Sequence, residues 1–179
     1  AAIYKIAALG GGLFDALTMA ALSYTSDVSC VAIAMGEASQ LSRLLLPAVS
    51  APLWYVATSH NRAPGALSIE EWPHITPSTH LYALLGHPVT QSPSHITHNA
   101  LFAQEGIDAH YLKIDIEPYE FEKVLPLLQA LPFSGFSVTM PYKGRFDLPS
   151  TNTLIRTETG EWATASTDGA GALDAIESV

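Results

Sequence analysis

The chain has 179 residues and a formal net charge of −9 at pH 7, with 8 lysines and arginines against 17 acidic residues. Its length allows one domain or two small ones, and a hydrophobic content of 48% with 14% charged residues is typical of a globular chain. The acidic balance argues against a nucleic-acid partner. The apolar runs are too short to span a bilayer, and the single cysteine excludes an internal disulfide and fits a reducing compartment.

The N-terminal part alternates between strand and helix patterns. Apolar runs at 2–9, 28–35 and 52–57 predict strands, and helical spacing of apolar residues at 13–25 and 41–46 predicts helices between them. Short links favour a parallel series of strand–helix–strand units. The three glycines at 10–12 predict a plain turn, because no Gly-x-Gly-x-x-Gly pattern follows them.

The first of these predicted strands contains one lysine, Lys5. A lysine on a buried strand loses hydration, which favours the neutral amine, a nucleophile toward carbonyl groups. The alternative is an exposed or ion-paired lysine.

The stretch Gly86–Asn99 organises the rest of the chain. It follows an apolar run at 81–85, typical of a buried strand, and precedes residues 100–106, which predict the body of a helix and its glycine stop. The loop contains two serines, Ser92 and Ser94. Their hydroxyls, the free backbone N–H groups and the helix dipole together suit an anion, although either serine could instead cap the helix.

The C-terminal part continues the α/β pattern. Strands are predicted at 109–116 and 135–139, a helix at 118–130 with Tyr119 on its core face, and a hairpin from 153–156 and 161–165. A last helix is predicted from Asp168, its cap, to Val179. His95, His98 and His110 lack metal-ligand spacing, so no metal site is predicted, and His98 is expected to be buried and hydrogen-bonded to backbone.

Three motifs in the second half resemble shikimate dehydrogenase. The loop has the pattern Gly-x-Pro-x-x-x-Ser-x-Ser-x-x-x-His-Asn. The run 137–143 is similar to the family's Val-Thr-x-Pro-x-Lys. The pair Asn152-Thr153 and Thr167-Asp168-Gly169 resembles its Asn-Thr and Thr-Asp-Gly motifs. The resemblance implies NADPH-dependent reduction of 3-dehydroshikimate, a mostly parallel α/β substrate domain, and a cofactor domain that would follow the last residues of this chain.

The same resemblance implies roles for individual residues. Lys143 would be the acid/base group and Asp168 its partner, with a surface ion pair as the alternative. Ser92 and Ser94 would bind the substrate carboxylate, and Thr139 and Asn152 would bind ring hydroxyls. Ser166 stands where the family usually has asparagine. Only nine positions separate Lys143 from Asn152, where the family has a helix-bearing segment, so a deletion or a flexible loop is expected.

The first part of the chain resembles type I 3-dehydroquinate dehydratase, up to about residue 72. The matching stretches are Tyr4-Lys5-Ile6-Ala7, Met35-Gly36-Glu37, Leu41-Ser42-Arg43 and Ala63-Pro64-Gly65. This resemblance implies that Lys5 forms a Schiff base and that Arg43 holds the substrate carboxylate, a task that suits a guanidinium. Arg62 and Ala66 depart from the family's loop. The implied fold is part of a (β/α)8 barrel, which three strands cannot close.

Together these patterns predict a barrel-like part at 1–76 and a dehydrogenase-like substrate domain at 77–179. This is the order of the bifunctional plant and chlamydial enzymes, which implies small anionic substrates (3-dehydroquinate, 3-dehydroshikimate and shikimate), NADP, no membrane partner, and a cytoplasmic location, or a plastid if the source is a plant. The alternatives are a non-catalytic quinate- or shikimate-sensing regulator of the quinate repressor type and a quinate-type dehydrogenase.

Overall fold

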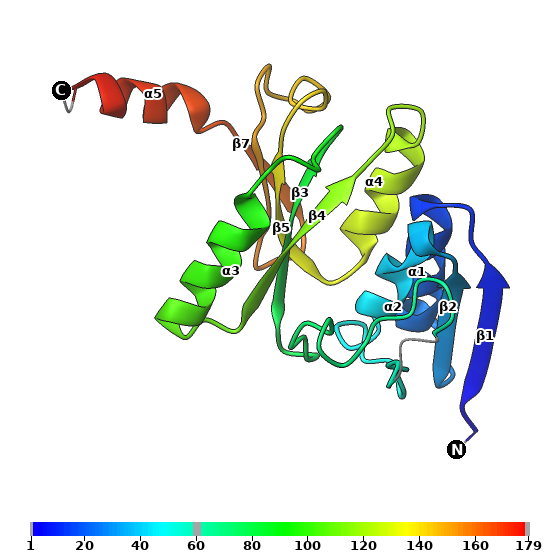
Figure 1. The fold of residues 1–179 in the computed structure, drawn as a ribbon. Coiled ribbons are helices and arrows are strands. Elements are labelled where there is room, and N and C mark those ends of the chain that lie inside the picture. The colour runs from blue at the N-terminus through cyan, green and yellow to red at the C-terminus, as the bar shows by residue number, and fades with distance from the viewer. Residues whose placement is uncertain (1, 59–61, 178–179) are drawn as a thin grey trace. The chain divides into compact units, whose positions relative to one another are not determined.

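The computed structural model describes residues 2–58 and 62–177, which form two compact units (Figure 1). Unit 1 contains the residues up to Thr79 together with Tyr119–Pro132. Unit 2 contains His80–Pro118 and the residues from Phe133 onward.

Unit 1 is built on one parallel strand–helix–strand motif. β1 (Tyr4–Leu9) pairs in parallel with β2 (Cys30–Met35), and α1 (Leu13–Thr25) connects them and packs on β2. A 3-10 turn, η1 (Glu37–Ser39), and a short helix, α2 (Leu41–Leu44), follow β2. The predicted first helix is therefore confirmed. α4 (Phe121–Ala130) belongs to the same unit and packs on α1.

Two expectations for unit 1 were wrong. β1 is an exposed strand, with Tyr4, Ile6 and Leu9 each at least 40% exposed, because β2 is its only neighbouring strand in the described part of the chain. Residues 52–57 do not form a strand: within the described part of the chain, their sheet-like pairing is one bridge from Ala57 to Ser68. The two-stranded sheet therefore does not show a (β/α)8-barrel segment.

Unit 2 is a five-stranded sheet with the order β4-β3-β5-β6-β7. Its strands are β3 (His80–Gly86), β4 (Ala109–Asp115), β5 (Phe133–Val138), β6 (Thr153–Arg156) and β7 (Trp162–Ala165). β3 is parallel to both β4 and β5, whereas β6 is antiparallel to β5 and β7. The hairpin prediction is confirmed, but the sheet is mixed rather than mostly parallel.

Helix α3 (Ser94–Glu105) connects β3 to β4 and begins at the second serine, earlier than the predicted helix body. Its end was predicted correctly: Gly106 adopts a left-handed conformation with φ 65°. Asn99 fixes α3 to the outer edge of β4, because its side chain donates to the carbonyl of Tyr111 (3.0 Å) and accepts the N–H of the same residue (2.8 Å).

The last elements complete unit 2. α5 (Asp168–Glu177) follows β7 after two residues, and none of its side chains is buried.

Earlier in the chain, Tyr119 was predicted to belong to the apolar core face of α4. It lies before the helix and is 76% exposed, because the buried face begins at Phe121.

Candidate active site

A polar cleft of about 290 Å³ opens at the carboxyl ends of β3 and β5. It is lined by the loop after β3, including Ser92 and Ser94, and by Thr139 and Met140 after β5. The two serine hydroxyls lie 2.9 Å apart, and the N–H of Ser94 donates to Ser92 Oγ (3.3 Å). Pro93 occupies the cap position of α3, and the hydroxyl of Ser92 satisfies the N–H of the first helical residue, as expected if this serine helps to cap the helix. Three of the predicted binding residues therefore share one cleft.

Charged side chains from β4 hold the serine loop by its backbone. Lys113 Nζ donates to the carbonyls of Thr90 (2.9 Å) and Ser92 (3.3 Å). Asp115 Oδ2 accepts the N–H of Val89 (3.1 Å). Both side chains belong to the same strand, two positions apart, so they reach the loop from the same side of β4.

A second group of predicted residues forms a hydrogen-bonded cluster. Lys143 Nζ donates to one oxygen of Asp168, and Asn152 Nδ2 donates to the other (2.6 Å). Asn152 also donates to Thr167 Oγ1 (2.8 Å) and accepts that residue's N–H (3.2 Å). The hydrogen bond from Lys143, followed by the one from Asn152, lowers the pKa of the Asp168 carboxyl. Asp168 therefore stays ionised beside the ammonium group.

Short stretches of chain near the end of β5 connect the cleft to the cluster, although the three cluster residues do not line the cleft itself. The N–H of Val138 donates to the carbonyl of Asn152 (2.7 Å), and one turn connects Thr139 to Lys143, with the N–H of Tyr142 donating to the carbonyl of Thr139 (2.9 Å). The nine-position connection from Lys143 to Asn152 is a compact turn without a helix. The N–H of Thr151 closes it by donating to the carbonyl of Lys143 (3.0 Å).

Unit 1 has its own cleft, of about 430 Å³, lined by Lys5, Arg43, Arg62 and Ala66 among others. Lys5 was expected on a buried strand, but it is exposed, with Nζ 4.2 Å from the centroid of the Tyr55 ring. The desolvation argument for its reactivity is therefore wrong. Arg43 is 7% exposed, its Nε has no hydrogen-bond partner among the described residues, and burial lowers its pKa.

Arg62, which departs from the resembled loop, forms an ion pair with Glu71. Its NH1 and NH2 groups each donate to one carboxylate oxygen, and Glu71 also accepts the N–H of Ser68 (2.8 Å). The hydrogen bond from Arg62, together with the one from Ser68, lowers the pKa of Glu71 to about 2. The guanidinium is therefore engaged at the edge of the cleft.

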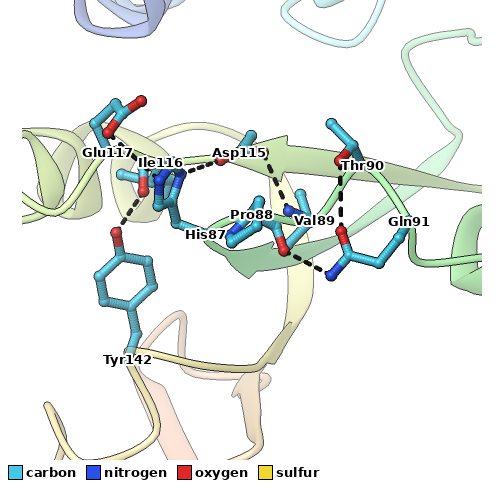
Figure 2. Close-up of polar contacts among 9 residues, drawn as sticks. All are labelled: His87, Pro88, Val89, Thr90, Gln91, Asp115, Ile116, Glu117 and Tyr142. Atoms are coloured by element: carbon cyan, nitrogen blue, oxygen red, sulfur yellow. Dashed lines mark hydrogen bonds and ion pairs between the residues drawn. The ribbon is translucent and has the colours of Figure 1, made fainter.

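Sequence reasoning missed His87, which contacts two carboxylates at the first cleft. Figure 2 shows its ring between Asp115 and Glu117. The sequence held a signal: Asp115 and Glu117 are two positions apart at the end of a predicted strand, and His87 follows the strand beside it. In parallel strands those ends meet at one edge.

His98, expected to be hydrogen-bonded to backbone, stacks on the ring of Tyr111 with centroids 4.3 Å apart. Within residues 2–58 and 62–177, no group of three or more histidine, cysteine or acidic side chains is arranged to hold a metal ion. No described helix is long and apolar enough to cross a membrane.

Family models match both parts of the chain. Residues 1–82 match type I 3-dehydroquinase, and residues 84–147 match the shikimate dehydrogenase substrate binding domain. The shikimate biosynthesis protein AroDE of Chlamydia muridarum is 31% identical over 147 residues, which is 78% of this chain and 30% of that protein. Each family match covers less than half of the chain, whereas the alignment with the Chlamydia protein covers 78% of it. That alignment therefore includes residues of both matched regions. The chain resembles the two-part shikimate biosynthesis proteins.

The dehydrogenase-like part has further relatives. The shikimate dehydrogenase (NADP(+)) of Pyrococcus abyssi is 40% identical over 109 residues, 54% of this chain and 40% of that protein. The crystal structure of shikimate 5-dehydrogenase from Listeria monocytogenes in complex with shikimate and NAD is 27% identical, with a TM-score of 0.52 over 59% of this chain and 40% of that one. The chain thus spans well under half the length of these relatives.

Proposed function

We propose that residues 77–179, which include unit 2, form the substrate-binding part of an NADP-dependent shikimate dehydrogenase, and that residues 1–76 form a separate dehydratase-like part. The observation that supports this proposal is the Lys143–Asp168–Asn152 cluster, which one turn of chain connects to Thr139 in the cleft of Ser92 and Ser94. An acid/base pair, a set of hydroxyl donors and a cleft of small-molecule size are the parts that reduction of a carboxylated ketone requires.

The chain's residues have separate tasks in this proposal. Ser92 and Ser94 hold the substrate carboxylate with their hydroxyls, and Thr139 and Asn152 contact ring hydroxyls. When hydride reaches the ketone carbon of 3-dehydroshikimate, the oxygen gains negative charge, and Lys143 donates a proton to it. In the reverse direction the neutral amine accepts that proton from shikimate. Asp168 orients the ammonium group and stays ionised because its pKa is lowered.

The reduced cofactor, NADPH, would supply the hydride when bound. The sequence around α5 has Gly169 and Gly171 but lacks the third glycine of a dinucleotide fingerprint, and no residue of this chain is assigned to the cofactor. Its binding would therefore require residues beyond those described.

Replacing Lys143 by alanine in the protein that contains this chain tests the proposal. We expect turnover to fall by about 10²- to 10⁴-fold, the usual contribution of a general acid, while shikimate binding is retained. The matched control is Lys123→Ala, an exposed lysine on α4. Near-normal turnover of Lys143→Ala with normal shikimate binding would show that the assigned role is wrong.

The cleft of unit 1 supports a second activity, dehydration of 3-dehydroquinate through an imine at Lys5 with Arg43 on the carboxylate. The supporting observation is that both side chains line the same cleft. Borohydride with 3-dehydroquinate should add a reduced ligand to Lys5, detected by peptide mass analysis, and Lys5→Arg should abolish the adduct. No Lys5 adduct in the longer protein would overturn this assignment.

The regulator alternative has no support among the relatives described above, whose names denote dehydrogenases or shikimate biosynthesis proteins. A cytoplasmic location remains a prediction.

A further inference from the structure

His87 lies between two carboxylates where the loop of the unit 2 cleft leaves β3 (Figure 2). Its Nδ1 is 2.6 Å from Asp115 Oδ1, and its Nε2 is 3.5 Å from Glu117 Oε2. A neutral imidazole has one N–H, so a proton on Nδ1 leaves the Nε2 lone pair facing Glu117. Only the protonated ring can donate to both carboxylates at the same time.

Asp115 connects this ring to the loop that carries the serines. One of its oxygens contacts His87, and the other accepts the N–H of Val89 (3.1 Å), on the far side of Pro88. The backbone N–H of His87 donates to the carbonyl of Met140 (3.0 Å), which also lines the cleft. Because Asp115 is hydrogen-bonded to the N–H of Val89, a movement of Asp115 would also move the start of the loop.

Other charged or titratable groups surround this arrangement. Lys113 donates to the loop carbonyls of Thr90 and Ser92 from the same strand as Asp115. Tyr142 donates its hydroxyl to the carbonyl of Ile116, between the two carboxylates in sequence, as Figure 2 shows. Burial, followed by the charges of Asp115 and Glu117, raises the pKa of Tyr142, while Arg145 opposes the shift. Tyr142 therefore remains neutral.

We propose that His87 is a positioning residue of the cleft. In its protonated form it holds Asp115 and Glu117 on either side of its ring and sets the loop that presents Ser92 and Ser94. The affinity of the cleft for a substrate carboxylate then falls as the pH rises and His87 loses its proton. This inference rests on the proposed function of the cleft as a shikimate site.

Shikimate binding, measured by isothermal titration calorimetry between about pH 5.5 and 8.5, tests the pH dependence. We expect binding to the unaltered chain to weaken by about twofold to fivefold across this range, as befits a partly exposed ion pair. His87→Gln should bind weakly at the low end and show a flat profile, because glutamine can donate to Asp115 but carries no charge. His80→Gln is the matched control, since the His80 ring lies beside Ser134 Oγ (3.2 Å) and does not line this cleft. It should keep the unaltered profile.

A second measurement needs neither a variant nor a ligand. In ¹⁵N NMR titrations of the unaltered chain, the backbone amides of Val89 and Ser94 should shift with the same midpoint as the His87 ring nitrogens. Loop amides that do not follow His87, or shikimate affinity that is independent of pH, would overturn the inference. The two proposals fail in different ways: absence of shikimate binding at every pH refutes the function of the cleft, whereas pH-independent binding refutes only the role of His87.

Discussion

Tyr142→Phe removes a single hydroxyl from the interior of unit 2. Tyr142 is 1% exposed, and its hydroxyl donates to the carbonyl of Ile116, a residue that is itself fully buried. Phenylalanine fills nearly the same space, so the main loss is this hydrogen bond, and the carbonyl is left where water has little access. Loss of a buried hydrogen bond with the acceptor left in place costs about 1–2 kcal/mol, and we expect the free energy of unfolding to fall by that amount.

Urea denaturation followed by the fluorescence of Trp162 measures this change in unit 2, where Trp162 stacks on Phe136 with centroids 5.0 Å apart. Trp54 and Trp72 are first replaced by phenylalanine so that only this reporter remains. Ile96→Val is the control in the same unit, because Ile96 is 65% exposed and removal of one of its methyl groups should change the free energy by less than about 0.5 kcal/mol. If the two variants lose the same stability, the hydrogen-bond reasoning is wrong.

Three further predictions concern the clefts. Gly86→Ala would place a Cβ 2.4 Å from the Thr139 side chain, so we expect a loss of about 1–3 kcal/mol in urea unfolding, whereas Gly144→Ala, whose nearest contact is 3.9 Å, should be nearly neutral. The lysine and asparagine partners of Asp168 lower the pKa of its carboxyl, so their bonds contribute full stability above the ordinary carboxyl range of about pH 4. That contribution should be lost as the pH falls through the lowered pKa. A ¹³C titration of the carboxyl checks this, and a normal midpoint would contradict it. Removing the guanidinium partner of Glu71 with Arg62→Ala should raise the carboxyl pKa from about 2 toward its ordinary value, measured in the same way, and an unchanged midpoint would show that this partner is not the main cause.

The sequence predicted elements best where periodicity and local stop signals agreed. Helix α1 has the predicted bounds, and Gly106 ends α3 as expected. The hairpin of β6 and β7 could also be predicted, because a Thr/Gly turn separates two short strand patterns. In each case the deciding information lies within a few residues along the chain.

Predictions that depended on contacts with residues far away in the sequence were more often wrong. The apolar run at 52–57 has the composition of a strand, but a strand requires a partner ladder, and a pattern cannot supply one. Lys5 has the predicted strand conformation, yet its exposure depends on what lies across β1. For the same reason the motifs indicated Lys143 and Asp168 as a pair, whereas the hydrogen bond from Asn152 to the other oxygen of Asp168 emerged only from the fold.

The attachment of Asn99 to β4 also affects how this protein meets other polypeptides. β4 is an outer strand, and the unpaired backbone groups of such strands readily recruit a strand from another molecule. Here the side chain of Asn99 occupies both backbone groups of Tyr111 in the middle of β4, and the N–H of Ala109 turns back to the carbonyl of Ile107. An incoming strand would have to displace the asparagine before it could pair there. The residue that docks α3 thereby also protects this edge of the sheet against aggregation.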